Sequence, residues 1–267
     1  MTAVLPVLAE GDYYYEVLGN GRFRSTIHAQ GAWNVHEQHM APASGIMADC
    51  LARHEPRDDM RMARLSYEIL GLIPGGEFEV VTTTLRAGRT IELVQAELTA
   101  GGRTALRATA WRMITSDTSA IAAFEDPVIP APEQCEPYDA ASVWPGGYIA
   151  SLTMKIADGH RAGSGTVWLH TEHPLTDRDD SSDLARLVGL VDTANGIAAR
   201  VPPGKGSYSF PNLDLQIHMY RKPAGEWLGL DNEVSFGTDG IGLTSTVLHD
   251  LNGPFGRAEQ ILTLRKS

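Results

Sequence analysis

The stretch from Asn212 to Arg221 places a carboxylate inside a pattern typical of a β-strand. Apolar residues occupy every second position of the stretch: Leu213, Leu215, Ile217 and Met219. This period predicts a strand with one buried face. Asp214 stands at the entry of this strand. A carboxylate that faces a groove beside a helix can take a proton from a water molecule, so Asp214 is a candidate general base.

Two other carboxylates have unusual surroundings. Asp49 and Asp192 each interrupt an apolar stripe at helical spacing, in the segments 39–54 and 181–199. Carboxylates are rarely buried unless they are paired. Hydrogen bonds to loop backbone would be a purely structural explanation for both residues.

The strand that carries Asp214 has a counterpart earlier in the chain. Residues 64–78 align with residues 212–227 when one residue is gapped near the proline, and in this alignment Ser66 is the counterpart of Asp214. The aspartates at 49 and 192 and the Arg-Ala pairs at 107–108 and 257–258 follow the same spacing, between 143 and 150 residues. The chain therefore contains two copies of one unit.

Both copies have the same predicted order of strand, strand, helix and four strands. The first copy has a helix at 39–54 and strands at 12–18, 22–29, 63–72, 77–86, 90–99 and 104–114. The second copy has a helix at 181–199 and strands at 148–156, 165–172, 213–220, 227–236, 241–250 and 257–265. We predict an α+β fold in which each unit is a curved antiparallel sheet around one long helix, and the two units share a sheet.

The middle of the chain separates the two copies. Residues 116–145 contain several prolines and few long apolar runs, which is typical of a linker. We therefore predict a first unit at 1–115, a linker at 116–145 and a second unit at 146–267.

The composition narrows the class of protein. Hydrophobic residues make up 43% of the chain, enough for a substantial core, and 33 acidic against 22 basic residues give a formal net charge of −11. This balance argues against nucleic-acid binding. Two cysteines, Cys50 and Cys135, favour a reducing compartment. The first ten residues lack the features of a signal peptide, and no apolar run reaches roughly 18 residues. We expect a soluble cytoplasmic protein that does not insert into membranes.

The sequence offers no pattern for a metal or a cofactor. His36 and His39 are three residues apart, but the histidines show no metal-ligand spacing with cysteine or carboxylate. No Gly-x-Ser-x-Gly motif occurs, which disfavours an α/β-hydrolase. The glycine-rich stretch 237–242 lies between predicted strands and does not open a helix, so it is no dinucleotide motif. We expect neither a metal nor a cofactor.

One helix wrapped by antiparallel strands and duplicated once resembles the double hotdog fold of the acyl-CoA thioesterase II family, within the thioesterase-like superfamily. The second copy carries the local matches to that family: Leu213-Asp214 followed by Arg221, Glu226-Trp227-Leu228, Glu233-Val234-Ser235 with Gly240 and Gly242, and Gln260. The resemblance in fold covers nearly the whole chain, and the specific residues cover about its last sixty.

The resemblance implies hydrolysis of acyl-CoA to a free acid and CoA by an activated water molecule. Asp214 would act as the base, Gln260 would hold the water, and Ser235 would hydrogen-bond either of them, with Thr238 as a rival for that role. Because other hotdog enzymes carry their base on the helix, Asp192 is the reserve candidate for the base.

The two copies differ at the implied site. Ser66 and Ala110 of the first copy align with Asp214 and Gln260, so only the second copy keeps both polar groups. We therefore expect one site in each chain, in the second copy.

Two alternatives remain for the activity. His218 lies four residues after Asp214 on the same strand face, and a hotdog enoyl-CoA hydratase or dehydratase would need such an Asp/His pair. A protein that binds an acyl thioester without catalysis is the other alternative. In each case the implied partner is an acyl-CoA. Since hotdog proteins commonly associate through their sheets, we also expect a homo-oligomer.

Overall fold

The computed structural model describes residues 6–203 and 206–266 of the 267-residue chain. The first half contains β1 (Tyr15–Gly19), β2 (Arg22–Ser25), α1 (Met40–Arg53), β3 (Met60–Ile69), β4 (Glu77–Arg86), β5 (Ile91–Ala100) and β6 (Arg103–Ile114). The second half contains β8 (Leu152–Ile156), β9 (Ser164–Thr171), α3 (Asp183–Val191), α4 (Ala194–Ile197), β11 (Asp214–Met219), β12 (Leu228–Phe236), β13 (Ile241–Asp250) and β14 (Gly253–Thr263). Short elements complete the chain: β7 (Glu136–Pro137), α2 (Gly147–Ala150), β10 (Tyr208–Ser209) and β15 (Arg265–Lys266).

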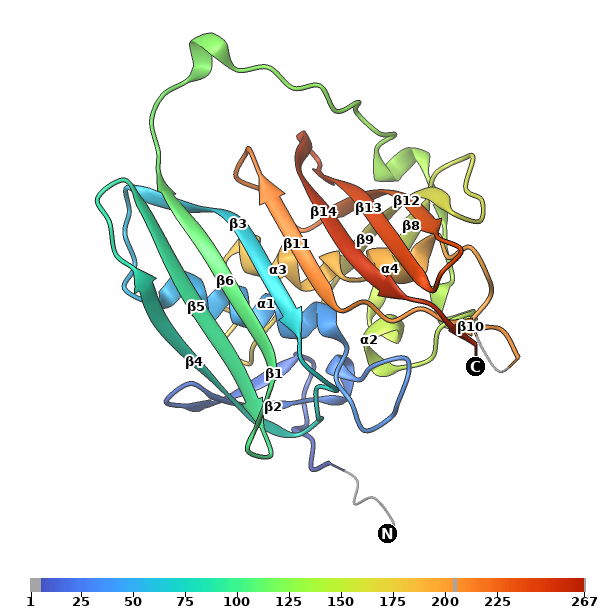
Figure 1. Cartoon of the computed structure of the whole chain (residues 1–267), viewed down its shortest axis with the longest axis horizontal. Helices are drawn as coiled ribbons and strands as arrows, with labels where there is room; N and C mark the ends of the chain where they lie inside the picture. The colour runs from blue at the N-terminus through green and yellow to red at the C-terminus, as the bar shows by residue number, and fades with distance from the viewer. Residues whose placement is uncertain (1–5, 204–205, 267) are drawn as a thin grey trace.

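Thirteen of the strands form one sheet, in the order β1-β2-β4-β5-β6-β3-β11-β14-β13-β12-β9-β8-β7. The two halves have the same strand order when each is followed outward from the junction, β3-β6-β5-β4-β2-β1 in the first half and β11-β14-β13-β12-β9-β8 in the second. The two halves meet where β3 pairs antiparallel with β11, with Leu65 opposite Ile217 and Ser66 opposite Gln216. Figure 1 shows this continuous sheet in front of α1 and α3. The predicted α+β fold with a shared sheet is thus confirmed.

The two long helices cross at a pair of glycines. A Cβ atom on Gly45 of α1 would lie 2.8 Å from the Cα of Gly189 of α3, closer than real Cβ contacts allow. Beside this crossing the Ser44 hydroxyl donates to the carbonyl of Val188 at 3.0 Å. Glycine therefore lets the helix backbones touch. The crossing also brings the C-terminal end of α3 next to the N-terminal end of α1, which positions the site described below.

The predicted helix at 181–199 is wrong in one respect, because it is two helices. It begins as expected, with the Ser182 hydroxyl capping the N–H of Ala185 at 3.2 Å. It then breaks after Val191, between α3 and α4. At the break the side chains of Asp192 and Thr193 take partners from distant segments, so tertiary contacts override the helical pattern.

The predicted strand at 148–156 is also wrong over its first residues, which form α2. The Gly146-Gly147 pair explains the difference. Gly146 has φ +113°, and a Cβ on Gly147 would collide with the carbonyl of Ile27. The glycines let this backbone run directly against the 3-10 turn Ile27–Ala29, and Tyr148 N–H donates to the carbonyl of Gln30 at 3.1 Å.

The stretch between the halves has two parts. From the end of β6 it arches away from the sheet (green in Figure 1) and is mostly exposed as far as residue 129, with local contacts of Phe124 to Tyr220 and of Asp126 to Tyr220 and Arg257. From Pro130 onward it packs on the second half, since the indole N–H of Trp168 donates to the Pro130 carbonyl at 2.7 Å and Tyr138 N–H donates to Met154 at 2.9 Å. No helix within the described residues is long and apolar enough to cross a membrane.

Candidate active site

A cavity of about 690 Å³ adjoins the meeting point of the two helix ends. Its wall includes His39 and Met40 at the start of α1, Asp192 and Thr193 at the break after α3, and Asn212 just before β11. Binding sites are commonly concave, largely apolar and furnished with a few convergent polar groups. This cavity has that character.

Asp192 is the central charged group of this wall. Its side chain is buried, and its Oδ1 atom accepts hydrogen bonds from the Asn212 amide at 2.7 Å and from the Gln260 amide at 2.8 Å. Burial raises the pKa of Asp192 to about 6, while the two amide donors lower it. A carboxylate with such a pKa is ionised at neutral pH and still accepts a proton readily, which suits a general base.

The elements around Asp192 explain why its two partners reach it. Gln260 lies on the face of β14 that Ala258 and Leu262 share, and these two apolar residues are buried against the helices. Alternation along the strand therefore points Gln260 inward. Asn212 precedes β11, and its amide also donates to the backbone carbonyl of Asp214 at 3.0 Å, which fixes its orientation.

His39 is the neutral neighbour of this carboxylate. Its Nδ1 atom accepts the backbone N–H of Ala41 at 3.1 Å as the N-cap of α1, so the ring hydrogen of the neutral imidazole is on Nε2. Burial lowers the pKa of His39 to about 3. The 3.6 Å approach of Nδ1 to Asp192 Oδ2 is therefore not an ion pair. Tyr148 lies against the imidazole, with ring centroids 4.3 Å apart.

The side-chain oxygens of Asp192 and Gln260 differ in whether they accept a hydrogen bond. Asp192 Oδ1 holds both amide donors, which leaves Oδ2 as the atom available for a proton. Gln260 Oε1 is buried and has no hydrogen-bond partner among the described residues. The Gln260 amide nitrogen thus donates to the Asp192 carboxylate, and the Gln260 amide oxygen is an acceptor without a donor among the described residues.

Residues 13–113 match the family model for the N-terminal domain of acyl-CoA thioesterases, and residues 132–264 match the model for the C-terminal domain. This chain belongs to the acyl-CoA thioesterase family. The resemblance inferred from the sequence is thereby confirmed. A comparison of this thioesterase-family chain with curated proteins gave no match.

Solved structures share the fold of this family member. A conserved protein of unknown function with a hotdog fold from Alicyclobacillus acidocaldarius is 13% identical, with 96% of this chain and 97% of that chain covered and a TM-score of 0.76. An acyl-CoA thioesterase II, TesB2, from Mycobacterium marinum is 16% identical, with 96% of each chain covered and a TM-score of 0.67. At these identities the likeness concerns the fold alone, and it agrees with the predicted hotdog architecture.

The structure does not bring the three predicted site residues together. Asp214 lies on the face of β11 opposite Leu215, and its Oδ1 atom accepts the N–H of Ile261 at 2.8 Å. Ser235 is exposed on β12, as is its rival Thr238 beyond the strand end. Since β13 separates β12 from β14, Ser235 is about 10 Å from Gln260 along the sheet and on its other face. Of the three side chains, only that of Gln260 contacts Asp192; Asp214 meets the group only through its backbone carbonyl, which accepts from Asn212.

Sequence reasoning missed Asn212 and His39. Asn212 opens the stretch that drew attention to Asp214, but its type carries no signal at a strand entry. His39 was noted only for its distance from His36. The available signal was Asp192 itself, a carboxylate within an apolar helical stripe, because such a residue needs polar partners from elsewhere in the fold.

The first half places an ion pair where the second half has the amide-held aspartate. Asp49, which aligns with Asp192, accepts a hydrogen bond from Arg53 at 2.6 Å, and Arg53 also contacts Asp180. The position that aligns with Gln260 is Ala110, a buried apolar residue. In the first half, therefore, Arg53 forms an ion pair with the carboxylate of Asp49.

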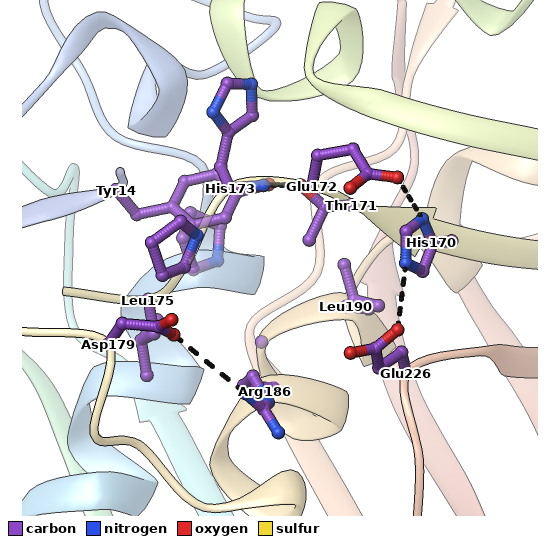
Figure 2. A pocket seen from close by; sticks show the side chains of 13 residues that line it. Tyr14, His170, Thr171, Glu172, His173, Leu175, Asp179, Arg186, Leu190 and Glu226 are labelled. Carbon is purple, nitrogen blue, oxygen red and sulfur yellow. Dashed lines mark hydrogen bonds and ion pairs between the residues drawn. The ribbon is translucent and has the colours of Figure 1, made fainter. Parts of the chain in front are cut away.

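A second, smaller cavity of about 160 Å³ lies beside α3 and the end of β9, shown in Figure 2. His170 stands between Glu172 and Glu226, at 3.6 Å from each, and Arg186 is 4.0 Å from Asp179. This cavity contains neither a predicted site residue nor a member of the Asp192 group. The larger cavity is therefore the candidate active site.

One group within the described residues could hold a metal ion. Asp12, His28 and His173 each offer one ligand atom, and these atoms lie within 4.8 Å of one another. The two imidazoles stack with centroids 3.9 Å apart, and Asp12 is almost fully exposed. None of the three residues lines the larger cavity, so this group takes no part in the chemistry proposed below.

Proposed function

We propose that this chain hydrolyses acyl-CoA thioesters to a carboxylic acid and CoA, with Asp192 as the general base in place of Asp214. The observation that carries the proposal is the buried carboxylate at the cavity wall, held through one oxygen by two amides and with a pKa raised to about 6. Membership of the acyl-CoA thioesterase family supports the choice of substrate.

The proposed reaction begins with a water molecule beside Asp192 Oδ2. This oxygen takes a proton as the water oxygen attacks the thioester carbonyl carbon. Asn212 and Gln260 keep the carboxylate in one rotamer by donating to Oδ1. When the tetrahedral intermediate collapses, the C–S bond breaks and the protonated Asp192 returns its proton to the departing thiolate. The products are the acid and the free thiol, and the base is restored.

The start of α1 is suited to stabilise the negative charge that develops on the carbonyl oxygen. The N-terminus of a helix carries a partial positive charge and free N–H groups. Met40, the first residue of α1, lines the cavity, whereas the N–H of Ala41 is already bound to His39. We assign the Met40 N–H to the carbonyl oxygen, with the helix end adding its dipole.

An enoyl-CoA hydratase is the second candidate, and a specific contact favours keeping it. His218, the partner first considered, is exposed on the outer face of β11 and does not line the cavity. His39, by contrast, lies 3.6 Å from Asp192, so the cavity does contain an Asp/His pair. The pair would have to add water across a double bond, and a hydration assay on an enoyl-CoA distinguishes this activity from hydrolysis.

The test is thiol release from a panel of acyl-CoAs by the parent, Asp192→Asn and Asp214→Asn, at equal folded fraction by circular dichroism. Loss of a general base typically costs about 10²- to 10⁴-fold in rate. We expect that loss for Asp192→Asn and a rate within a few-fold of the parent for Asp214→Asn. Asp49→Asn is the matched control, an equivalent aspartate in the other half. A dead Asp214→Asn beside an active Asp192→Asn would return the base to the strand.

A further inference from the structure

The cavity beside Asp192 has two walls of different character. The inner wall includes three buried apolar side chains, Trp144 at 8% exposed, Ile149 at 6% and Met154 at 4%, beside the buried polar residues Gln38 and Asn195. The outer lip consists of apolar side chains that are about half exposed: Leu70 at 48%, Leu72 at 51% and Leu213 at 47%. The inner wall comes from the end of the inter-repeat segment and the start of the second half, and the lip comes from the ends of β3 and β11.

Trp144 is fixed close to the carboxylate. Its indole N–H donates to the carbonyl of Gly196 at 3.1 Å, and Gly196 follows Asp192 by about one helical turn. A Cβ atom on Gly196 would lie 3.2 Å from the indole nitrogen, so the ring lies directly against this backbone. Trp33 packs edge-on against the same indole, with centroids 5.1 Å apart. These contacts hold the ring in one place and make it a firm end to the inner wall.

The outer lip of the cavity has nearby arginines that could contact the pantetheine and phosphate part of a CoA thioester. Arg265 lines the cavity, and the guanidinium of Arg103 lies near Gly71, a Cβ on which would be 3.7 Å away. Two guanidinium groups thus lie near a cavity whose lining also includes Glu37. The pantetheine arm has amides and ends in phosphates, so a half-exposed lip with nearby cations suits it better than the dry inner wall does.

Resting on the proposed hydrolase function, we propose that residues 138–154 form the acyl-recognition element of this site. The acyl chain binds against Trp144, Ile149 and Met154, and the pantetheine arm leaves across Leu70 and Leu72. The preferred substrates are CoA thioesters of mainly apolar acyl groups, with the chain length set by the Trp144 ring. The end of the joining segment and the start of the second half thus select the substrate, while the helix ends and β14 supply the catalytic groups.

The test is a chain-length series of saturated acyl-CoAs, from hexanoyl to palmitoyl, with kcat/KM measured for the parent, Trp144→Ala, Met154→Ala and the lip variant Leu72→Ala. Each methylene that gains a buried place is worth about fourfold. Trp144→Ala should therefore raise the ratio of long-chain to short-chain kcat/KM by about tenfold or more, and Met154→Ala should move it in the same direction. Leu72→Ala should raise KM by a similar factor for every chain length, because all substrates share the pantetheine arm.

Two further measurements, on Trp144→Phe and on binding affinity, separate the possible outcomes. Trp144→Phe retains an aromatic wall and should leave the ratio within about threefold of the parent, which separates lost packing from opened space. Calorimetric binding of the same series to the parent and Trp144→Ala tests the inference by affinity. If the parent binds acyl-CoAs without releasing thiol, the proposed hydrolysis fails and the chain-length dependence of binding still decides the acyl site. A ratio that shifts for Leu72→Ala and not for Trp144→Ala or Met154→Ala would overturn the assignment.

Discussion

Replacing Gln260 by leucine should move the pH dependence of the reaction toward alkaline pH. In the structure the Gln260 amide donates to Asp192 Oδ1 at 2.8 Å and so lowers the pKa of a carboxyl that burial raises to about 6. Leucine fills a similar volume without donating a hydrogen bond. The carboxylate loses a stabilising partner, and its pKa must rise.

The size of the shift follows from the contact. A hydrogen bond to a charged group contributes about 1.5–3 kcal/mol, which corresponds to roughly one to two pKa units. From a pKa of about 6, the Asp192 carboxyl of Gln260→Leu should titrate between about pH 7 and pH 8. At pH 7 the ionised fraction would fall from about nine-tenths to between about a half and a tenth.

The assay is kcat/KM for one acyl-CoA between pH 5 and pH 9. The parent should lose activity below about pH 6, and Gln260→Leu should lose it one to two units higher while recovering much of its rate at pH 9. Thr244→Val is the matched control, since Thr244 lies opposite Gln260 in the sheet and makes no hydrogen bond to Asp192. An acid limb that stays in place or moves to lower pH in Gln260→Leu would refute the role of the amide and of Asp192 as the titrating base.

Three further outcomes are expected. Because the folded pKa of Asp192, about 6, exceeds its reference value of 3.8, the ionised carboxylate costs stability as pH rises through this window. Asp192→Asn should therefore raise the free energy of unfolding at pH 8, by up to about 3 kcal/mol, and leave it nearly unchanged below pH 3.8 in denaturant titrations. Arg112→Met should destabilise the fold by about 3–5 kcal/mol in the same titrations, since it leaves the buried carboxylate of Glu92, 3.0 Å away, without its partner and removes the donor to the Leu51 and His54 carbonyls at the end of α1. Limited proteolysis should cut within residues 116–129, and the two fragments should co-elute in gel filtration because β3 pairs with β11. Separation of the fragments would contradict a stable sheet shared through this pair of strands.

The repeat made most of the fold predictable. Alternating residues located the long strands of the sheet, and matching spacings in the two copies indicated the shared architecture. What the pattern lacked was the set of contacts between distant segments. The break after Val191 depends on partners of Asp192 and Thr193, and α2 depends on a close approach to Ile27. The homo-oligomer and the domain boundaries at 115 and 145 stay predictions.

The placement of Asp214 shows how strand parity bears on a site. The sheet has its helices on one side, so the apolar parity of each strand faces them and the opposite parity faces away. Asp214 alternates with Leu215 and Ile217 and so had to point away from the helices. Gln260, by contrast, shares its parity with the buried Ala258. A polar residue on the buried face of a strand, such as Gln260, and a carboxylate within an apolar helical stripe, such as Asp192, were the better indicators of the site.

The comparison of the two halves explains why one chain should contain one working base. Asp49 and Asp192 occupy matching places near the ends of their helices, but an arginine holds the first and two amides hold the second. Burial raises the pKa of Asp49 as it does that of Asp192, but the Arg53 nitrogen, 2.6 Å away, binds the Asp49 Oδ2 atom in an ion pair and lowers this pKa. Amides donate hydrogen bonds without that charge and both bind Oδ1 of Asp192, so the second oxygen stays free and the pKa stays near 6. Duplication therefore supplied two equivalent carboxylates, and of the two Asp192 lines the larger cavity whereas Asp49 does not, so Asp192 is the one placed to meet a substrate.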